Sequence, residues 1–333
     1  MKPIAVIILN WNGANLLREF LPKVVENTNH TLADVIVADN GSTDNSLQLL
    51  RDNFPEVKVI AYPENYGFAE GYNRAIADTN YPYTILLNSD AAPAPGWIEP
   101  LYQFMETHPE YAACQPKILS ARDNSKFEYA GASGGFIDRN GYPYCRGRIF
   151  DIVETDAGQY DTVIDIDWAT GAALMVRSQL YTSLGGLDRD FFAHMEEIDL
   201  CWRMRRNGQH HIAVIPQSIV YHLGGGSLPV SNPKKTYLNF RNNLLLLHKN
   251  LPPAQGRRTL LKRRLLDTIA FAKFALTLDW DNAKAIVRAH NDFRRMRRNY
   301  TPASIDGETN PLKQRPNILT KFYLRRRRTF SSL

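Results

Sequence analysis

The chain has 333 residues, of which 44% are hydrophobic and 22% are charged, fractions that exclude a disordered or fibrous protein. The net charge of +6 conceals an asymmetry, because residues 251–333 carry 19 Lys and Arg against 6 Asp and Glu, whereas residues 1–250 carry 21 against 28. The basic C-terminal segment therefore favours contact with an anionic partner.

The cysteines and the apolar segments indicate in which cellular compartment the protein is expected. The cysteines Cys114, Cys145 and Cys201 are odd in number and far apart, a pattern typical of a reducing environment. The apolar run at 4–9 is too short to span a membrane, does not resemble a signal peptide, and is not followed anywhere by about 18 uninterrupted apolar residues. We expect a cytoplasmic protein without a transmembrane helix, either free or peripheral on the cytoplasmic face of the membrane.

The first hundred residues alternate apolar runs with amphipathic patterns. The apolar runs predict strands at 4–9, 35–38, 57–61 and 84–87. The patterns between them predict helices at 16–25, 46–54 and 68–77. Uninterrupted apolar strands separated by helices indicate an α/β fold with a mostly parallel central sheet covered by helices.

Each of three predicted strands ends in a polar turn: Asn-Trp-Asn-Gly at 10–13, Asp-Asn-Gly-Ser at 39–42 and Asn-Ser-Asp at 88–90. Ligands of open α/β sheets bind beyond such strand ends. Asp39 is placed to accept from a base or a ribose hydroxyl, and Ser42 or Thr43 to cap the next helix. The alternative for this turn is a βα connection whose polar residues only cap the helix.

The Asn88-Ser89-Asp90 turn has the oxygen ligands that a hard cation such as Mg²⁺ or Mn²⁺ prefers. Such an ion neutralises charge on a departing nucleoside diphosphate. Taken alone, a short Asn-x-Asp turn is common and carries little weight.

Beyond residue 170 the sequence predicts fewer elements. The patterns predict strands at 172–176, 212–215 and 219–221, a helix at 196–207 closed by Gly208, and a glycine-rich loop at 224–227. After 252–253 a helix is predicted, with apolar residues at helical spacing and Arg263 and Asp267 near the opposite face. The apolar residues are Leu261, Leu265, Ile269, Ala272 and Leu276. Residues 299–320 read as a loop or linker before an Arg-rich tail at 325–328.

Glu196, Glu197 and Asp199 lie together at the start of the 196–207 helix. Neighbouring carboxylates raise each other's pKa, and one of them is a candidate for the base that deprotonates an acceptor hydroxyl. The alternative is a set of solvated acids that complement the helix dipole. His222 has two similar interpretations, as a structural residue or as a metal ligand.

Taken together, these motifs resemble the family-two glycosyltransferases with the GT-A fold, and within them the rhamnosyltransferase-like group. The resemblance spans about residues 3–250. It includes VIILNWNG, ADNGSTDNS, ENYGFAEGYN, LLNSDA, DWATGAALMVRS, GGLDRDFFAHMEEIDLCWRMRRNG, VYHLGGGS and YLNFRNNLLLLHKN. It implies a catalytic domain at 1–250, a basic helical extension at 251–298, and a linker with an Arg-rich tail at 299–333.

The resemblance also implies roles for particular residues. The nucleotide pocket would be formed by Asn10, Asp39, Asn40, Ser42, Asn65, Gly67, Phe68 and Asn88, with Arg241 and Asn242 closing over the diphosphate. The metal ligand of the DxD position would be Asp90, with His222 as a second ligand. The sugar and acceptor pocket would be shaped by Trp168, Gly171, Ala172 and Asp199. The base position is occupied by Glu197, beside Glu196.

Two residues depart from the family pattern. Asn88 stands at the first position of the DxD triplet and is a weaker ligand than Asp, so we expect the metal to enter mainly as a metal–nucleotide complex. Glu197 stands where Asp is usual, and a shift of about 1 Å in a catalytic group costs about 100-fold in rate. Either the pocket compensates for the longer side chain or Glu196 takes the role.

The resemblance implies an inverting transferase that moves a sugar, with rhamnose the first to test, from a dTDP- or UDP-linked donor. The acceptor would be a hydroxyl of a lipid-linked or cell-surface saccharide. A catalytically weak sugar-nucleotide-binding protein is the alternative. Nicotinamide enzymes and P-loop NTPases are disfavoured because GxGxxG and GxxxxGK[ST] are absent, and a glycoside hydrolase needs no nucleotide pocket.

The basic C-terminal helix has two interpretations. It either binds an anionic membrane surface or packs on the catalytic domain with its arginines as a solvated face. Nucleic-acid binding is not expected, since no recognition motif accompanies the charge.

Overall fold

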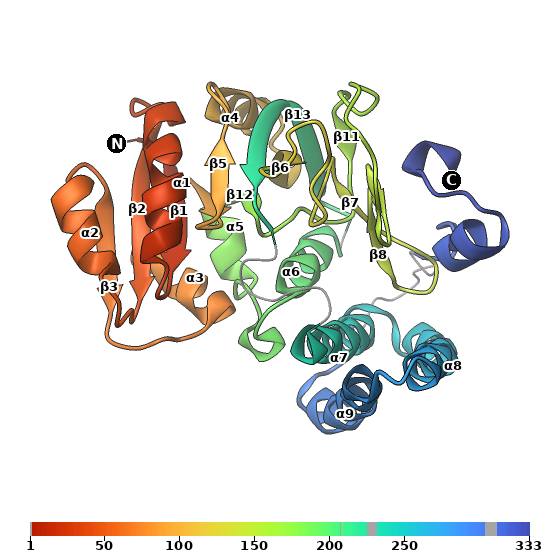
Figure 1. The fold of residues 1–333 in the computed structure, drawn as a ribbon. Coiled ribbons are helices and arrows are strands. Elements are labelled where there is room, and N and C mark those ends of the chain that lie inside the picture. Colours follow the sequence, from red (N-terminus) through yellow and green to blue (C-terminus); the bar gives the residue numbers. More distant parts are fainter. Residues whose placement is uncertain (1, 207, 225–231, 304–311) are drawn as a thin grey trace.

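The computed structural model describes residues 2–206, 208–224, 232–303 and 312–333 (Figure 1). The strands are β1 (Ile4–Asn10), β2 (Ala33–Asn40), β3 (Lys58–Tyr62), β4 (Tyr83–Leu87), β5 (Ala91–Pro93), β6 (Tyr111–Ser120), β7 (Gly135–Ile137), β8 (Pro143–Cys145), β9 (Arg148–Ile149), β10 (Ile152–Val153), β11 (Ile164–Asp165), β12 (Ala173–Arg177) and β13 (His211–His222). The helices are α1 (Ala14–Asn27), α2 (Ser46–Asn53), α3 (Phe68–Ala77), α4 (Ile98–Thr107), α5 (Ser178–Ser183), α6 (Glu196–Arg205), α7 (Pro233–Asn250), α8 (Pro253–Leu276) and α9 (Trp280–Met296).

The central sheet has, within the described residues, the strand order β11-β13-β6-β12-β4-β1-β2-β3, with β5 paired to β13. The predicted strands of the first hundred residues are confirmed, and β1 to β4 pair in parallel. β12 runs antiparallel to both β4 and β6, while β13 is parallel to β6. The sheet is therefore mixed, with a parallel half formed by the first four strands.

Two apolar cores cover the two faces of this sheet. On β1, the side chains of Ile4, Val6 and Ile8 pack with those of α1, α2 and α4. The alternate residues Ala5 and Ile7 pack instead toward α3, α6 and α7. This alternation follows from the two-residue period of a strand, and burial on both faces explains why β1 is apolar throughout.

The two strands predicted at 212–215 and 219–221 are one strand, β13. Its register against β6 shifts between Ile215 and Ile219, where Pro216 interrupts the ladder because it has no amide hydrogen. β13 pairs with β6 on both sides of this irregularity. The two predicted strands are therefore in the right places, and only their separation is wrong. The predicted helix at 196–207 ends at Arg205 in α6, and Asn207 lies outside the described residues.

A second, four-stranded antiparallel sheet has the order β10-β9-β8-β7. The C-terminal residues 312–333 pack against it: the ring centroid of Phe330 lies 5.1 Å from that of Phe136, and Phe322 contacts Phe150. The amide of Phe330 also donates to Glu154 Oε1 at 2.8 Å. This part of the predicted linker and tail is thus bound to the second sheet, whereas 304–311 lie outside the described residues.

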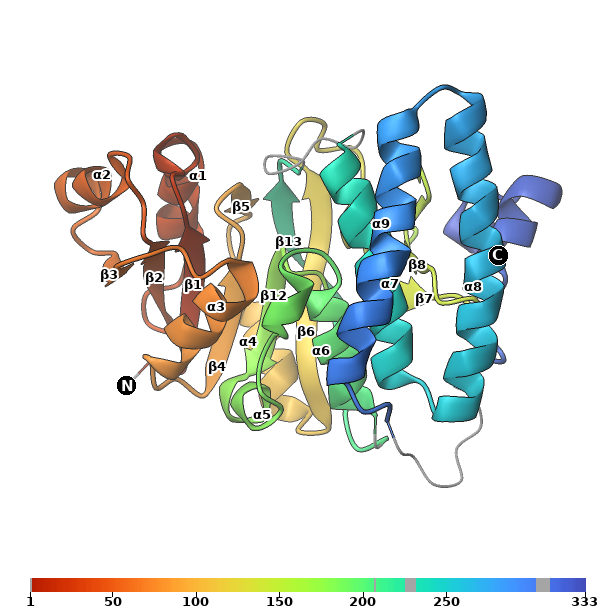
Figure 2. The ribbon, with the colours of Figure 1, turned by 90° about the horizontal axis from the view of Figure 1, so that it is seen from below.

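The helices α7, α8 and α9 pack side by side at one end of the sheet (Figure 2). The predicted basic helix after 252–253 is confirmed as α8. Its polar residues Arg263 and Asp267 are buried, while Leu261 and Leu265 are exposed. Over the described ranges, none of the helices is long and apolar enough to cross a membrane.

Candidate active site

The carboxyl ends of β1, β2 and β4 meet at one edge of the sheet. Asn10 stands directly opposite Asp39 in the β1–β2 register. β4 lies on the other side of β1, with Leu87 opposite Ile8, so the Asn88–Asp90 turn follows at the same edge. The three polar turns predicted from the sequence are thereby brought together where ligands of open α/β sheets bind.

The first group joins Asn10, Asp39 and Ser42. Asn10 Nδ2 donates to Asp39 Oδ1 at 2.8 Å and to Ser42 Oγ at 3.2 Å, while the Ser42 amide donates to Asp39 Oδ2 at 3.0 Å. Asn10 Oδ1 is buried and has no hydrogen-bond partner in the described structure. A buried polar atom without a partner is costly unless a ligand satisfies it, so this group is a candidate for contact with a base or ribose.

The second group ties the 64–67 turn to the end of β2. Asn40 Nδ2 donates to Asn65 Oδ1 at 2.9 Å and to the carbonyl of Gly67 at 3.0 Å, and Asn40 Oδ1 accepts from the Tyr66 amide at 3.0 Å. Gly67, with φ of 81°, directly precedes α3, which begins at Phe68. The asparagine bonds hold the turn and the N-terminus of α3 at the site edge.

The third group surrounds His222, at the end of β13. Its Nε2 lies 3.0 Å from Asp90 Oδ1 and 3.2 Å from Asn88 Nδ2, and its Nδ1 lies 3.5 Å from Glu128 Oε2. Burial lowers the pKa of His222, but hydrogen bonds to Asp90 and Glu128 outweigh it and raise the pKa to about 10. Burial also opposes ionisation of Asp90, yet the bond to His222 brings its pKa below the usual value.

This third group fits a divalent metal in part. The Asp90 carboxylate and the His222 imidazole lie together, but His222 must lose its proton before its nitrogen can ligate a metal. Glu128 is placed as the outer carboxylate that commonly orients a ligating histidine. The part of the chain that the structure describes has no group of three or more His, Cys, Asp or Glu residues arranged to hold a metal ion. A metal bound here would therefore need further ligands from water or from a bound molecule.

The fourth group lies at the N-terminus of α6. Three residues just before the helix have φ between 66° and 74°: Phe192, His194 and Met195. Such left-handed backbone is uncommon for residues other than glycine and clusters at functional sites. Within the described structure, His194 Nε2, Glu196 Oε2 and Glu197 Oε2 are all buried without a hydrogen-bond partner.

The ionisation of these groups is perturbed. Burial raises the pKa of Glu197 to about 7, and burial together with the neighbouring Glu197 raises the pKa of Glu196 further. Burial, aided by Lys235, lowers the pKa of His194 to about 4, so its imidazole is neutral at physiological pH. A carboxyl with a pKa near 7 is suited to accept a proton in catalysis.

Gly171 lies between this acidic group and α3. A Cβ added at Gly171 would lie 3.8 Å from Phe68 Cζ and 3.9 Å from Glu197 Cβ. Its neighbour Ala172 accepts a hydrogen bond from the Asn88 amide at 3.0 Å. Gly171 therefore lies between the side chains of Phe68, at the N-terminus of α3, and Glu197, at the N-terminus of α6.

Several residues expected at the site have structural roles instead. Asp199 is fully buried and bonded to Arg203, Lys249 and Asn250, each at 2.8 Å, which anchors α6 to α7. The Trp168 indole donates to the carbonyl of Phe136 at 3.0 Å.

Arg241 and Asn242 donate to backbone carbonyls of the 190–194 loop. In this structure they therefore support the loop that leads into α6, next to the acidic pair. The glycine-rich loop predicted at 224–227 is described only at Gly224, since 225–231 lie outside the described residues.

Three further residues join the site without having been predicted. Glu128 contacts His222, although nothing in its local sequence marks it, because the two residues are far apart in the chain. His194 stands beside the acidic pair. Trp11 is 57% exposed directly after Asn10, an unusual exposure for tryptophan that makes it a candidate stacking surface.

The mixed sheet with helices on both faces, followed by C-terminal helices, is a GT-A fold, and the protein is a glycosyltransferase. Residues 5–158 match the family described as Glycosyl transferase family 2.

The chain is 26% identical over 241 residues to the N-acetylglucosaminyl-diphospho-decaprenol L-rhamnosyltransferase of Mycobacterium tuberculosis, covering 66% of this chain and 76% of that protein.

Solved structures share the fold at low sequence identity. GalNAc-T7 with UDP, GalNAc and Mn²⁺ superposes with a TM-score of 0.56 at 15% identity, over 74% of this chain but only 48% of GalNAc-T7. The mannosyltransferase PcManGT of Pyrobaculum calidifontis, in complex with GDP-Man and Mn²⁺, gives a TM-score of 0.54 at 13% identity, over 88% of this chain and 87% of its own. At these identities the similarity concerns the fold.

Proposed function

We propose that the protein is an inverting glycosyltransferase that moves a sugar from a nucleoside-diphosphate donor to a hydroxyl of a lipid-linked or cell-surface saccharide. The observation that carries this proposal is the convergence at one sheet edge of the Asn10–Asp39–Ser42 group, the His222 group and the acidic pair of α6. Residues 1–250 would form the catalytic domain, with 251–298 and 299–333 as its extension and tail.

Donor binding is assigned to the two groups beyond β1 and β2. Asp39 and the unpartnered Asn10 Oδ1 are placed to bond a base and ribose. The exposed Trp11 indole would stack on a ring. A thymidine or uridine diphosphate is our first choice, with rhamnose as the sugar, because the Mycobacterium tuberculosis relative is named as an L-rhamnosyltransferase.

A divalent metal, Mg²⁺ or Mn²⁺, would be held by Asp90 and His222 together with diphosphate oxygens. When bound, it would neutralise the charge that develops on the leaving diphosphate. Glu128 would fix the orientation of the His222 ring, and Asn88 would contact the same ligand shell. The GalNAc-T7 and PcManGT structures, both solved with Mn²⁺, support this assignment.

The chemical step is a single displacement at the anomeric carbon. Glu197 accepts the proton of the acceptor hydroxyl, the hydroxyl oxygen forms a bond to the anomeric carbon, and the bond to the diphosphate breaks on the opposite face. One base suffices for this geometry, and the configuration of the sugar inverts. The pKa of about 7 at Glu197 and its closeness to Gly171 and Phe68 support its role as base.

The acceptor proposal comes from chemistry named for a relative. The Mycobacterium tuberculosis enzyme is named for an N-acetylglucosaminyl-diphospho-decaprenol acceptor. By analogy we assign a lipid-linked saccharide to this protein.

A thermal-shift screen tests donor binding first. Nucleoside diphosphates and their sugars are each added with Mn²⁺, Mg²⁺ or EDTA, and a ligand that binds the folded state raises the melting temperature. We expect a metal-dependent shift for one base. No shift with any nucleotide, from a protein that melts cooperatively, would contradict the donor site.

Transfer is then measured with the donor that binds, on an N-acetylglucosaminyl-diphospho-prenol and on free saccharides. NMR of the product reads the configuration of the new bond. Retention would contradict the single displacement, and transfer to free saccharides alone would contradict the lipid-linked acceptor.

A further inference from the structure

The helix α8 exposes its apolar side and buries its polar side. The exposed fractions are 70% for Leu261, 68% for Leu265, 62% for Ile269 and 85% for Leu276. These residues form one stripe along a helix of 24 residues, about 36 Å long. A helix on the surface of a globular protein normally turns such a stripe toward the core.

The orientation of α8 is fixed from its buried side. The Arg263 guanidinium lies 3.9 Å from the centroid of the Tyr142 ring and donates to Asn243 and Asp267. Asp267 Oδ2 lies 3.0 Å from His290 Nε2 on α9. Rotating the helix to bury its leucines would break these buried bonds at high cost, so exposure of the stripe is a property of the fold.

Basic side chains border the stripe on both sides. Arg264 follows Arg257 by seven positions, about two helical turns, which places both on one flank, and Lys262 and Lys273 lie on the other. All four are exposed. An apolar strip between two rows of cations is typical of helices that lie in the plane of a membrane surface.

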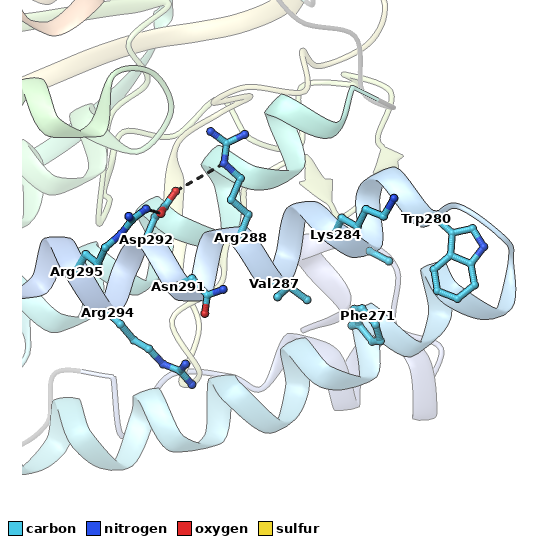
Figure 3. A pocket seen from close by; sticks show the side chains of 10 residues that line it. Phe271, Trp280, Lys284, Val287, Arg288, Asn291, Asp292, Arg294 and Arg295 are labelled. Atoms are coloured by element: carbon cyan, nitrogen blue, oxygen red, sulfur yellow. Dashed lines mark hydrogen bonds and ion pairs between the residues drawn. The ribbon is translucent and has the colours of Figure 1, made fainter.

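The neighbouring surface continues this pattern. A groove of about 920 Å³ between α8 and α9 is lined by the apolar Phe271, Trp280 and Val287 and by the basic Lys284 and Arg294, among others (Figure 3). Leu278, in the turn that joins the helices, is 76% exposed, and Trp280, the first residue of α9, is 51% exposed. Tryptophan is enriched at the boundary between lipid and water.

We infer that the α8–α9 hairpin seats the enzyme on an anionic lipid bilayer, with the α8 stripe at the acyl boundary and the flanking cations at the phosphates. We choose a bilayer over a second copy of the chain as the partner of this surface because of its charge. Residues 253–296 carry 10 Lys and Arg against 4 Asp and Glu. A second copy would oppose like charges, whereas a bilayer of anionic lipids is complementary. This inference is independent of the proposed reaction.

The test is co-sedimentation of the full chain with vesicles of equal parts phosphatidylcholine and phosphatidylglycerol, against vesicles of phosphatidylcholine alone. We expect binding to the mixed vesicles, weakened by salt. The variant L265S/I269S is expected to bind about tenfold more weakly, because apolar burial in the bilayer is lost. K262E/K273E should lose at least about tenfold, through lost attraction to the lipid phosphates.

Matched controls use exposed residues elsewhere. V59S/V163S removes two exposed valines far from α8 in sequence, and K23E/R51E reverses two exposed charges on α1 and α2. Neither control should change vesicle binding by more than about twofold. The nucleotide-induced thermal shift should be unchanged in L265S/I269S, which separates failure of this inference from failure of the proposed donor site.

Three results would overturn the inference. The first is no binding to the mixed vesicles at low salt. The second is equal loss in L265S/I269S and V59S/V163S, which would remove the assignment to α8. The third is a dimer seen by light scattering that L265S/I269S dissociates while vesicles do not bind, which would assign the stripe to a second copy.

Discussion

At the N-terminus of α6, Glu196 and Glu197 differ in how far they are buried. Glu196 is only 5% exposed, whereas Glu197 is partly exposed and faces the space beside Gly171. A base must be accessible to the acceptor hydroxyl and lose its proton near the working pH. The partial exposure of Glu197 and its pKa of about 7 favour it for the proposed role. His194 is held neutral by burial and therefore adds no charge beside the acidic pair.

Replacing Glu197 by glutamine is expected to lower kcat by about 100-fold or more, because the proton acceptor is removed while size and folding are kept. Glu196→Gln is the matched control and should retain most activity. Steady-state transfer rates, with melting temperatures to verify folding, make the comparison. If Glu196→Gln abolishes turnover and Glu197→Gln does not, the two roles are exchanged.

The pH dependence follows from the raised pKa of about 7 at Glu197. The base must be ionised, so kcat/KM should fall as the pH drops below about 7. For stability the sign is opposite: a carboxyl whose folded pKa is raised binds its proton more tightly when folded, so its stabilising contribution is present at low pH and lost as the pH rises through 7. We therefore expect the unfolding free energy of Glu197→Gln, measured with urea, to lack the part of the decrease with rising pH that Glu197 causes. An identical pH trend in wild type and variant would contradict it.

Glu128 is proposed to position His222 rather than to contact substrate. We expect Glu128→Gln to weaken binding of Mn²⁺ with nucleoside diphosphate by about tenfold, since outer-shell partners of ligating histidines have effects of this size. Asp123→Asn, which changes a partly exposed carboxylate in a nearby segment, is the control. Calorimetric titration measures the affinity, and equal constants for wild type and Glu128→Gln would remove the positioning role.

Among the elements, the βα turn after β2 and the 64–67 turn belong to the proposed donor side, and their backbones are in contact. Gly41 has φ of 73°, and a Cβ there would lie 2.5 Å from the Glu64 carbonyl carbon. Asn40 ties the same two turns together through its side chain. The donor pocket thus depends on two turns that approach more closely than side chains allow.

Gly41→Ala is expected to lower the free energy of unfolding by about 2–4 kcal/mol, through left-handed backbone and the clash with Glu64. Gly67→Ala is the matched control, since it has φ of 81° but nothing within 4 Å of the added Cβ. Its expected cost is about 1 kcal/mol. Denaturant unfolding measures both changes in the free energy of unfolding. Equal decreases in the two variants would show that the close approach of Gly41 to Glu64 adds nothing to the cost.

Across the whole molecule, the C-terminal helices support the element that carries the acidic pair. α7 anchors α6 through Lys249 and Asn250 on the buried Asp199, and α8 packs on α7 through Arg263 and Asn243. The tail then returns to the second sheet at Phe330. The extension is therefore part of the folded unit that positions the acidic pair, in addition to carrying the exposed stripe.

Phe330→Ala is expected to destabilise the protein by about 1–3 kcal/mol, because the ring packs with Phe136, Tyr144 and Tyr160. Leu324→Ala, in the same tail but 79% exposed, should cost no more than about 0.5 kcal/mol. Thermal unfolding distinguishes them. Indistinguishable stabilities would mean that the tail contributes nothing to the fold.

Much of the site could be predicted from the sequence because its residues lie in short local patterns. The turns at Asn10, Asp39 and Asn88 each follow an apolar run, and parallel strands bring such ends together. Asp199 and Trp168 were expected to face substrate and are instead buried in structural bonds, since a motif does not state which way a side chain points. Glu128 could not be predicted, because its partner His222 is reached only by tertiary folding.

By itself, the sequence determined the first four strands and the three helices between them, the polar strand ends and the helical spacing of the α8 leucines. These depend on periodicity over a few residues, which local backbone geometry sets. Only the tertiary structure decided that β12 runs against its neighbours, that β13 is one strand, and that the α8 leucines face outward. The reason is that periodicity specifies which residues share a face, while the partner of that face is chosen by contacts between distant segments, here Arg263 with Tyr142 and Asn243.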